Sequence, residues 1–256
     1  MTRVVILMYH IVAAPLSALE ARYCCTPRAF DAQMRHLRSS GVRLLTLEQV
    51  ADAFDGHSGW PDTGVAVTFD DGFEDTFINA LPVLRRYRIP ATMFAVADRL
   101  GGDNEWMCKR GFPQRRLMSA SQLREMSAAG IVLGSHTRTH PRLPELDVDA
   151  KLDEIRGSKS RLEEELGSKV EAFAYPYGLF DEDARQAVQE AGYRVACCTR
   201  SGFNGPQVDR YLLRRIEVYG RDNLWQFRQK LKFGANDVSV LYPLRYYAGR
   251  ISSRLG

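Results

Sequence analysis

The chain has 256 residues, of which 45% are hydrophobic and 26% are charged, and its formal net charge at pH 7 is +4. Such a chain can bury one large core, and barrel folds reach this length as a single domain. No segment is long and apolar enough to span a bilayer, which argues against an integral membrane protein. The apolar run at residues 4–8 leads into polar residues without a small-residue cleavage pattern, so we expect a first strand, no secretory signal and a cytoplasmic location.

The cysteines favour free thiols. They are Cys24, Cys25, Cys108, Cys197 and Cys198. An odd number with two adjacent pairs makes a poor disulfide framework and fits a reducing compartment. No Cys-x-x-Cys spacing occurs, so we do not expect a cysteine metal site.

The first half of the chain alternates short apolar runs with helical patterns. Strands are expected at residues 4–10, 42–45, 65–69 and 91–97. Helices are expected at residues 27–41, from residue 47 onwards and at residues 76–87. Thr26 caps the first of these helices, and Thr46 with Gln49 has the spacing of a capping box for the second.

The second half continues the alternation. Strands are expected at residues 131–134, 170–174, 193–198 and 212–218. Helices are expected at residues 120–130, 147–166 and 181–191. Residues 101–113 form an insertion long enough to be a lid or a substrate loop, with a mobile surface loop as the alternative.

Seven or eight strands that alternate with helices predict a parallel sheet closed into a barrel. Polar residues follow several of these strands, namely His10, Asp70 with Asp71, His136, and Tyr175 to Tyr177. Barrel active sites assemble at the C-terminal ends of the strands. An open doubly wound sheet would place ligands at the same ends and is the alternative.

Two carboxylates and two imidazoles supply the ingredients of a hydrolytic metal site. Asp70 and Asp71 end the run at residues 65–69, and His136 and His140 follow in Ser135-His136-Thr137-Arg138-Thr139-His140. A buried carboxylate is costly unless it faces a cation or hydrogen-bond donors. Imidazole nitrogens and a carboxylate oxygen are what Zn²⁺ accepts in catalytic sites, where three protein ligands leave room for water and substrate.

Each half of this pattern also has a plainer interpretation. Asp-Asp-Gly is common in turns and helix caps, and two histidines four residues apart are often solvated. We propose Asp71, His136 and His140 as the ligands of a divalent metal. Successive residues on an extended chain point in opposite directions, so Asp70 cannot easily bind the same ion and is free to act as the general base.

A third segment, Phe173-Ala174-Tyr175-Pro176-Tyr177-Gly178, completes a set of three motifs. In this order, the segments resemble the motifs of the polysaccharide deacetylases, the NodB-homology or carbohydrate esterase family 4 proteins. The resemblance covers about residues 4–218. It implies a distorted (β/α)7 TIM-like barrel, a divalent metal, Asp70 as the base, and a Tyr177 backbone N–H that helps to hold the oxyanion. Zn²⁺ is the expected ion, with Co²⁺, Ni²⁺, Mn²⁺ and Fe²⁺ as alternatives.

The chain departs from the commonest family pattern at two places. An arginine that orients the base usually stands where this chain has Ala174, and we expect Arg215 to substitute from another strand end, with an ordinary surface arginine as the alternative. The late Leu-x-His motif that carries the general acid is also missing. Met8-Tyr9-His10 resembles the N-terminal segment of permuted members that act on β-1,6-linked poly-N-acetylglucosamine, so His10 is the expected acid and a structural histidine is the alternative.

The C-terminal region is basic and aromatic. Between residues 210 and 256, ten Lys or Arg residues stand against three acidic residues. We expect residues 1–219 to form the barrel and residues 220–256 to form an appendage, not an independent domain, in which Asp222 caps a helix that ends near Lys232. Such a tail can contact an anionic membrane at the inner leaflet, with a solvated basic helix as the alternative. Nucleic-acid binding is not expected, because no recognition motif accompanies the charge.

The resemblance implies a metal-dependent hydrolase that removes acetyl groups from N-acetylhexosamine units. The substrate would be an N-acetylated glycan or glycolipid, in a cell-surface polysaccharide, a lipopolysaccharide or its lipid-linked precursor. The absence of an export signal favours an intracellular precursor. Two alternatives are hydrolysis of a small cyclic amide or a formamide, and a catalytically degenerate barrel that binds carbohydrate.

Overall fold

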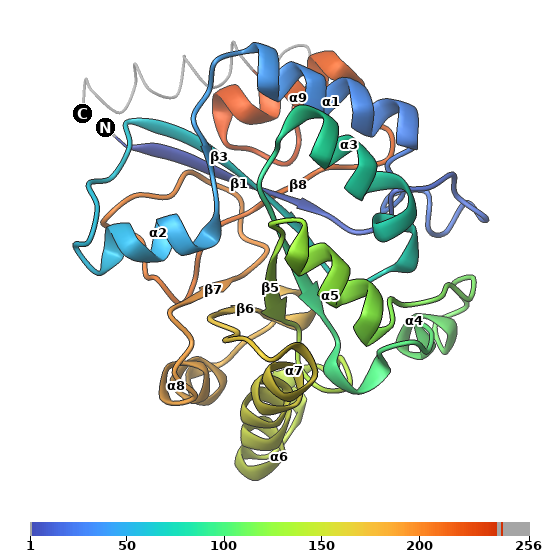
Figure 1. Ribbon diagram of the computed structural model, residues 1–256, viewed down its shortest axis with the longest axis vertical. Coiled ribbons are helices and arrows are strands. Elements are labelled where there is room, and N and C mark those ends of the chain that lie inside the picture. Colours follow the sequence, from blue (N-terminus) through green and yellow to red (C-terminus); the bar gives the residue numbers. More distant parts are fainter. Residues whose placement is uncertain (1, 240–241, 243–256) are drawn as a thin grey trace.

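All strands of the described chain lie in one parallel sheet (Figure 1). The computed structural model describes residues 2–239 and residue 242. The strands are β1 (Arg3–Tyr9), β2 (Leu44–Leu45), β3 (Thr63–Phe69), β4 (Ala91–Ala95), β5 (Val132–Ser135), β6 (Ala172–Ala174), β7 (Val195–Cys197) and β8 (Ile216–Glu217). They are hydrogen-bonded in the order β7-β6-β5-β4-β3-β1-β8, and β2 pairs with β3 beside this path.

The sheet curls until its two edges meet. Cys197 of β7 forms a parallel bridge with Leu213, three residues before β8 begins. The Leu213 N–H donates to the carbonyl of Ala196 at 2.8 Å, and the Cys198 N–H donates to the carbonyl of Leu213 at 2.9 Å. β8 then pairs with β1, so the ring is closed through a short irregular segment. The predicted distorted (β/α)7 barrel is confirmed.

Helices surround the sheet, as Figure 1 shows. They are α1 (Pro27–Ser39), α2 (Leu47–Phe54), α3 (Leu81–Tyr87), α4 (Glu105–Cys108), α5 (Ala120–Ala128), α6 (Val148–Leu152), α7 (Ser158–Leu166), α8 (Glu182–Glu190) and α9 (Leu224–Phe233). The predicted caps at Thr26 and Thr46 are confirmed, because the side chain of Thr26 accepts from the backbone of α1 and Thr46 forms a capping box with Gln49. Ser119 forms a further capping box with Gln122 at the start of α5. Each box satisfies two backbone N–H groups that a helix start leaves without partners.

Two predicted helices contain a π turn. The π turn η1 (Thr76–Ala80) precedes α3, and η4 (Asp153–Gly157) joins α6 to α7. Pro82 lies in the first turn of α3, where a missing backbone N–H costs little. The helices predicted at residues 76–87 and 147–166 are therefore present as continuous helical segments.

The strands are buried on both faces. Val5, Leu7 and their neighbours pack towards the helices in the main apolar core, whereas Val4 and Ile6 pack in a second cluster with residues of β6 and β7. This alternation follows the two-residue period of a strand. The five cysteines are free thiols, as predicted, and only Cys108 is not fully buried.

The first helix after residue 219 belongs to the barrel core. α9 packs against α1, and its Phe227 is fully buried in the main apolar core. The prediction that Asp222 caps this helix is wrong: the N-cap is Asn223, whose side chain accepts from the Gln226 N–H at 2.9 Å. Asp222 instead pairs at 2.5 Å with the buried ammonium of Lys230.

Part of the predicted membrane-contact segment at residues 220–256, namely residues 240–241 and 243–256, lies outside the described residues. Among the helices that the structure describes, none has the length and apolar character needed to cross a membrane. Contact of the tail with a membrane surface stays a prediction.

The burial of Phe227 gives a direct test of how α9 contributes to the fold. Phe227→Ala should lower the free energy of unfolding by about 3–5 kcal/mol, because it leaves a cavity in the core. Trp225 lies on the same helix with 41% of its surface exposed, so Trp225→Ala should change the free energy of unfolding by only about 0.5 kcal/mol. Urea unfolding measures both. Equally small losses would mean that α9 is not part of the core.

Candidate active site

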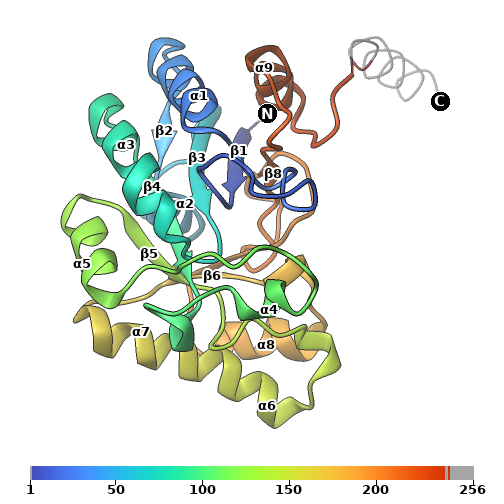
Figure 2. The same ribbon diagram turned by 90° about the vertical axis from the view of Figure 1, so that its right-hand side faces the viewer.

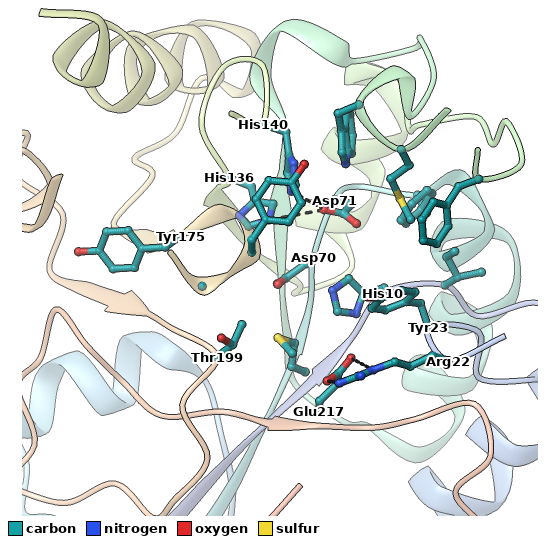
Figure 3. Close-up of a pocket in the computed structure, with 18 of the residues that line it drawn as sticks. His10, Arg22, Tyr23, Asp70, Asp71, His136, His140, Tyr175, Thr199 and Glu217 are labelled. Atoms are coloured by element: carbon teal, nitrogen blue, oxygen red, sulfur yellow. Dashed lines mark hydrogen bonds and ion pairs between the residues drawn. The ribbon is translucent and has the colours of Figure 1, made fainter. Parts of the chain in front are cut away.

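A cavity of about 320 Å³ opens at the C-terminal ends of the strands (Figure 3). Its wall includes Met8, His10, Arg22, Tyr23, Asp70, Asp71, Trp106, Met107, Arg110, Phe112, His136, His140, Tyr177, Gly178, Thr199 and Glu217. Among the residues proposed from the sequence, the two acids, the three histidines and Tyr177 all line this cavity. Arg215 does not line it but is fully buried in contact with Asp70.

Left-handed backbone conformations concentrate at this cavity. In the described chain, five residues other than glycine have a positive φ: Asp71 (70°), Arg88 (51°), Thr137 (66°), His140 (67°) and Tyr177 (59°). All except Arg88 belong to the three sequence motifs. Such a conformation costs of order 1–3 kcal/mol at a residue with a side chain, and it persists only where the surroundings hold it. The fold therefore places strain where the motif side chains must turn into the cavity.

The sequence argument for separating Asp70 from Asp71 needs a correction. We expected the alternation of an extended chain, but β3 ends at Phe69 and Asp71 is left-handed. Asp70 continues the ladder, because its N–H donates to the carbonyl of Tyr9 at 3.0 Å. The turn at Asp71, and not the alternation of a strand, sends this carboxylate towards the histidines.

Asp71, His136 and His140 converge on one point. An oxygen of Asp71 lies 3.5 Å from Nε2 of His136 and 3.2 Å from Nε2 of His140. One ligand atom from each residue lies within 4.8 Å of the others, and all three side chains are buried. These distances leave room for a cation between the three atoms.

The hydrogen bond on the far side of His136 fixes how its ring faces Asp71. Nδ1 of His136 lies 2.7 Å from the carbonyl of Ala174, which can only accept, so Nδ1 carries a proton. In the neutral ring Nε2 then presents a lone pair to the carboxylate of Asp71. Two electron-rich atoms face each other stably only with a proton or a metal ion between them. A metal ligand held by a backbone carbonyl in this way has its ring orientation and tautomer fixed.

The pKa shifts follow from burial and from these contacts. Burial opposes ionisation of Asp71, but the hydrogen bonds with His136 and His140 hold its pKa well below the usual range. Burial lowers the pKa of both imidazoles. At His140 burial is the larger effect, and the pKa stays below its usual value. At His136 the hydrogen bond with Asp71 and the charge of Asp70 outweigh burial and raise the pKa. Asp71 is thus ionised at neutral pH and available as a ligand.

Asp70 forms a bidentate ion pair with Arg215. Nη1 and Nη2 of Arg215 donate to the two carboxylate oxygens at 2.6 Å and 2.8 Å, and both side chains are buried. Burial would raise the pKa of Asp70, but the charge of Arg215 keeps it below the usual range. Nε of Arg215 donates to the carbonyl of Cys198 at 3.1 Å, which fixes the guanidinium. Arg215, which directly precedes β8, thus contacts the acid next to the proposed metal ligands.

The insertion at residues 101–113 covers His140. The ring of Trp106, in α4, stacks on the imidazole with centroids 4.6 Å apart and planes 21° apart. The Tyr177 ring meets the same imidazole edge-on at 4.7 Å. Nδ1 of His140 is buried without a hydrogen-bond partner in the described chain, so packing orients this ring. The insertion forms part of the cavity wall.

The turn at Tyr177 needs the glycine that follows it. Gly178 has φ 68°, and a Cβ added there would lie 2.0 Å from Oγ1 of Thr199. Gly178 therefore lets the turn pass close to the chain that follows β7. This close approach fixes the backbone of Tyr177 at the cavity wall.

His10 lies on the opposite side of the cavity from His140, close to Asp70 and against the ring of Tyr23 (Figure 3). The centroids of His10 and Tyr23 are 5.3 Å apart. Beside them, Arg22 pairs with Glu217 at 2.7 Å. The sequence argument missed both members of this pair. Arg22 follows an irregular segment with no periodic pattern, and Glu217 shows no motif, so neither gives a local signal.

A second buried charge cluster links two loops of the cavity. Arg115 contacts both oxygens of Glu20 at 2.9 Å and 2.8 Å and donates to the carbonyl of Ala14 at 2.9 Å. It also lies 3.4 Å from Asp75, whose carboxylate accepts the Val12 N–H. Burial raises the pKa of Asp75 to about 6. The segments before α1 and after α4, which lie at the right of Figure 1 and face the viewer in Figure 2, are joined by this cluster. The sequence argument missed it as well.

Comparison with known sequences gives a family match. A family model described as polysaccharide deacetylase matches residues 59–196. The poly-beta-1,6-N-acetyl-D-glucosamine N-deacetylase of Staphylococcus epidermidis is 29% identical over 205 residues, which cover 77% of this chain and 68% of that protein. The matched region contains Asp70, Asp71, His136, His140 and Tyr177.

Solved structures share the fold. The deacetylase PplD of Streptococcus pyogenes, solved in complex with acetate, superposes with a TM-score of 0.77 at 25% identity and covers 90% of this chain and 98% of its own. IcaB from Ammonifex degensii superposes with a TM-score of 0.75 at 27% identity, over 91% and 97% of the two chains.

The geometry predicts which substitutions remove the metal. His136→Ala and His140→Ala should each reduce zinc content far below one equivalent per chain after reconstitution, because two remaining ligands hold the ion too weakly. His10→Ala should leave zinc content unchanged. Elemental analysis of the purified variants is the measurement. About one equivalent of zinc in both histidine variants would contradict the ligand set.

Proposed function

The chain belongs to the polysaccharide deacetylase family and is a hydrolase of amide bonds in N-acetylated sugars, and we propose that it works with a divalent metal held by Asp71, His136 and His140. When bound, such an ion lowers the pKa of water towards ~7 and polarises the amide carbonyl. A borderline ion suits two imidazoles and one carboxylate, so Zn²⁺ is the expected metal, with Co²⁺, Ni²⁺, Mn²⁺ and Fe²⁺ as alternatives.

One observation carries this proposal. The carbonyl of Ala174 fixes a proton on Nδ1 of His136, so that in the neutral ring Nε2 presents a lone pair to Asp71. Two such buried acceptors need a proton or a metal ion between them, because neither atom can satisfy the other, and a divalent ion would serve Asp71 and both histidines at once. The stacked Trp106 shields the third ligand, His140, from solvent.

Asp70 takes the proton of the attacking water. Its carboxylate is ionised and held in place by Arg215, and it lies in the same cavity wall as the proposed ligands. The bidentate pair leaves Asp70 little freedom to rotate towards a metal, so it acts as a base and not as a ligand. Arg215 is therefore a positioning residue that keeps the base oriented and charged.

The remaining groups act on the amide itself. Tyr177 offers its backbone N–H to the oxygen on which negative charge develops. His10 gives a proton to the departing nitrogen as the C–N bond breaks, since an amine leaves poorly without one. Acetate and the free amino sugar are the products.

We propose N-acetylhexosamine units as the substrate, in a cell-surface polysaccharide, a lipopolysaccharide or a lipid-linked precursor. The name of the staphylococcal relative supports the sugar class. A cytoplasmic site of action and contact of the basic tail with the inner leaflet stay proposals.

The two adjacent acids should separate under mutation. Asp70→Asn should keep zinc but lose most acetate release, because the amide cannot accept the proton. Asp71→Asn should lower zinc content itself, because it removes a charged ligand. Zinc analysis and acetate release from N-acetylated oligosaccharides measure both effects. If the two variants had equal zinc affinity and equal rates, the assigned roles would be wrong.

His10→Ala should reduce amide hydrolysis by roughly 10² to 10⁴, since it removes general-acid assistance. The loss should be much smaller on an acetyl ester of the same sugar, whose alcohol leaves with less need of a proton. Steady-state rates on the two substrates give the comparison, with zinc content as the control. Equal losses on amide and ester would make His10 a positioning residue.

A further inference from the structure

One cation of the cavity wall has no carboxylate partner among the described residues. Asp70 is paired with Arg215 and Glu217 with Arg22, and Asp71 faces the two histidines. Each acid of the wall therefore has a cationic or metal partner. Arg110 also lines the cavity, and in the described chain no carboxylate lies within ion-pair distance of it. Arg110 is exposed to solvent at the cavity wall and is available to an anionic group of a ligand.

Arg110 lies next to the metal-site residues. Its guanidinium carbon is 5.6 Å from the ring centroid of Tyr177 and 5.6 Å from that of Phe112. The ring of Tyr177 in turn contacts His140. Arg110 thus lies one side chain away from the metal ligands and belongs to the insertion that covers them.

A second arginine borders the same ring. The guanidinium carbon of Arg142 is 5.2 Å from the Tyr177 centroid. Its acidic neighbour, Glu145, lies 3.6 Å away, and both side chains are largely exposed, so this pair is weak. Tyr177 is therefore bordered by two cations at the edge of the cavity.

A guanidinium is a planar fork of donors that matches phosphate oxygens, and charge-assisted bonds of this kind are about twice as strong as neutral ones. A neutral glycan would offer Arg110 no anionic partner, and its contact with the neutral phenol of Tyr177 does not supply one. We propose that the sugar substrate carries a phosphate group close to its N-acetylated residue, and that Arg110 and Arg142 bind this phosphate beside Tyr177. This inference rests on the proposed deacetylase function and narrows its substrate to a phosphorylated N-acetylhexosamine.

The phosphate could belong to a soluble sugar phosphate or to a lipid phosphate ester. Three probes separate these sources: N-acetylglucosamine 1-phosphate, its octyl phosphodiester, and the neutral octyl glycoside of N-acetylglucosamine. Acetate release gives kcat and KM for each probe on the zinc-reconstituted protein. Binding of each probe to Asp70→Asn is measured separately by calorimetry, so that binding has a readout independent of turnover.

Arg110→Gln should raise KM for the phosphodiester by about 10- to 100-fold, because it removes a charge-assisted contact, and change KM for the neutral glycoside less than about 2-fold. Arg142→Gln should act in the same direction with a smaller effect. Lys109→Gln is the matched control: it removes the same charge from the neighbouring position, where Lys109 pairs with Glu105 outside the cavity wall. It should leave both KM values unchanged. Tighter binding of the octyl phosphodiester than of the 1-phosphate would indicate the lipid ester as the source.

The proposal is overturned if Arg110→Gln raises KM for the neutral and phosphorylated probes equally, since Arg110 would then only hold the insertion against Tyr177. It is also overturned if Lys109→Gln matches Arg110→Gln, or if phosphorylated probes bind Asp70→Asn no better than the neutral glycoside. Release of acetate from the neutral glycoside alone would refute the phosphate site and leave the deacetylase function supported. If no probe released acetate but the phosphorylated probes still bound more tightly, the proposed function would be refuted instead.

Discussion

The burial of two adjacent carboxylates is the constraint on which the site depends. Asp70 and Asp71 are 2% and 4% exposed, and charges this deep are costly unless each has a partner. Arg215 neutralises Asp70, and His136 and His140 face Asp71. This arrangement supports the proposed division of roles, in which Asp71 binds a metal and Asp70 acts as the base.

The backbone supplies the geometry that this charge arrangement needs. Left-handed residues at Asp71, His140 and Tyr177 turn each motif sharply at the end of its strand. The closed ring of strands then brings these three turns to one face of the barrel. The cost of the strained turns is met by a well-packed core, in which strands are buried on both faces.

Much of this arrangement could be predicted from the sequence, because it depends on local patterns. Apolar runs and caps predicted the strands and helices, and motif residues at strand ends predicted which side chains share the cavity. Arg215 could be proposed because Ala174 left the base without its usual partner. Contacts between irregular segments gave no such signal: Trp106 on His140, Arg22 with Glu217, and Arg115 with Glu20 join residues that no periodicity relates. Asp222 and Asn223 are adjacent and both suit a helix cap. Only the fold shows that Asn223 caps α9, while Asp222 pairs with Lys230 of the same helix.

The central claim is that Asp71, His136 and His140 bind one metal ion while Asp70 stays paired with Arg215. Anomalous scattering at the zinc edge, from crystals of the zinc-reconstituted protein, tests it most directly. The account predicts one peak, bounded by a carboxylate oxygen of Asp71 and Nε2 of each histidine, with the bidentate pair of Asp70 and Arg215 intact. A peak bound to Asp70, or no peak in the cavity at saturating zinc, would contradict it.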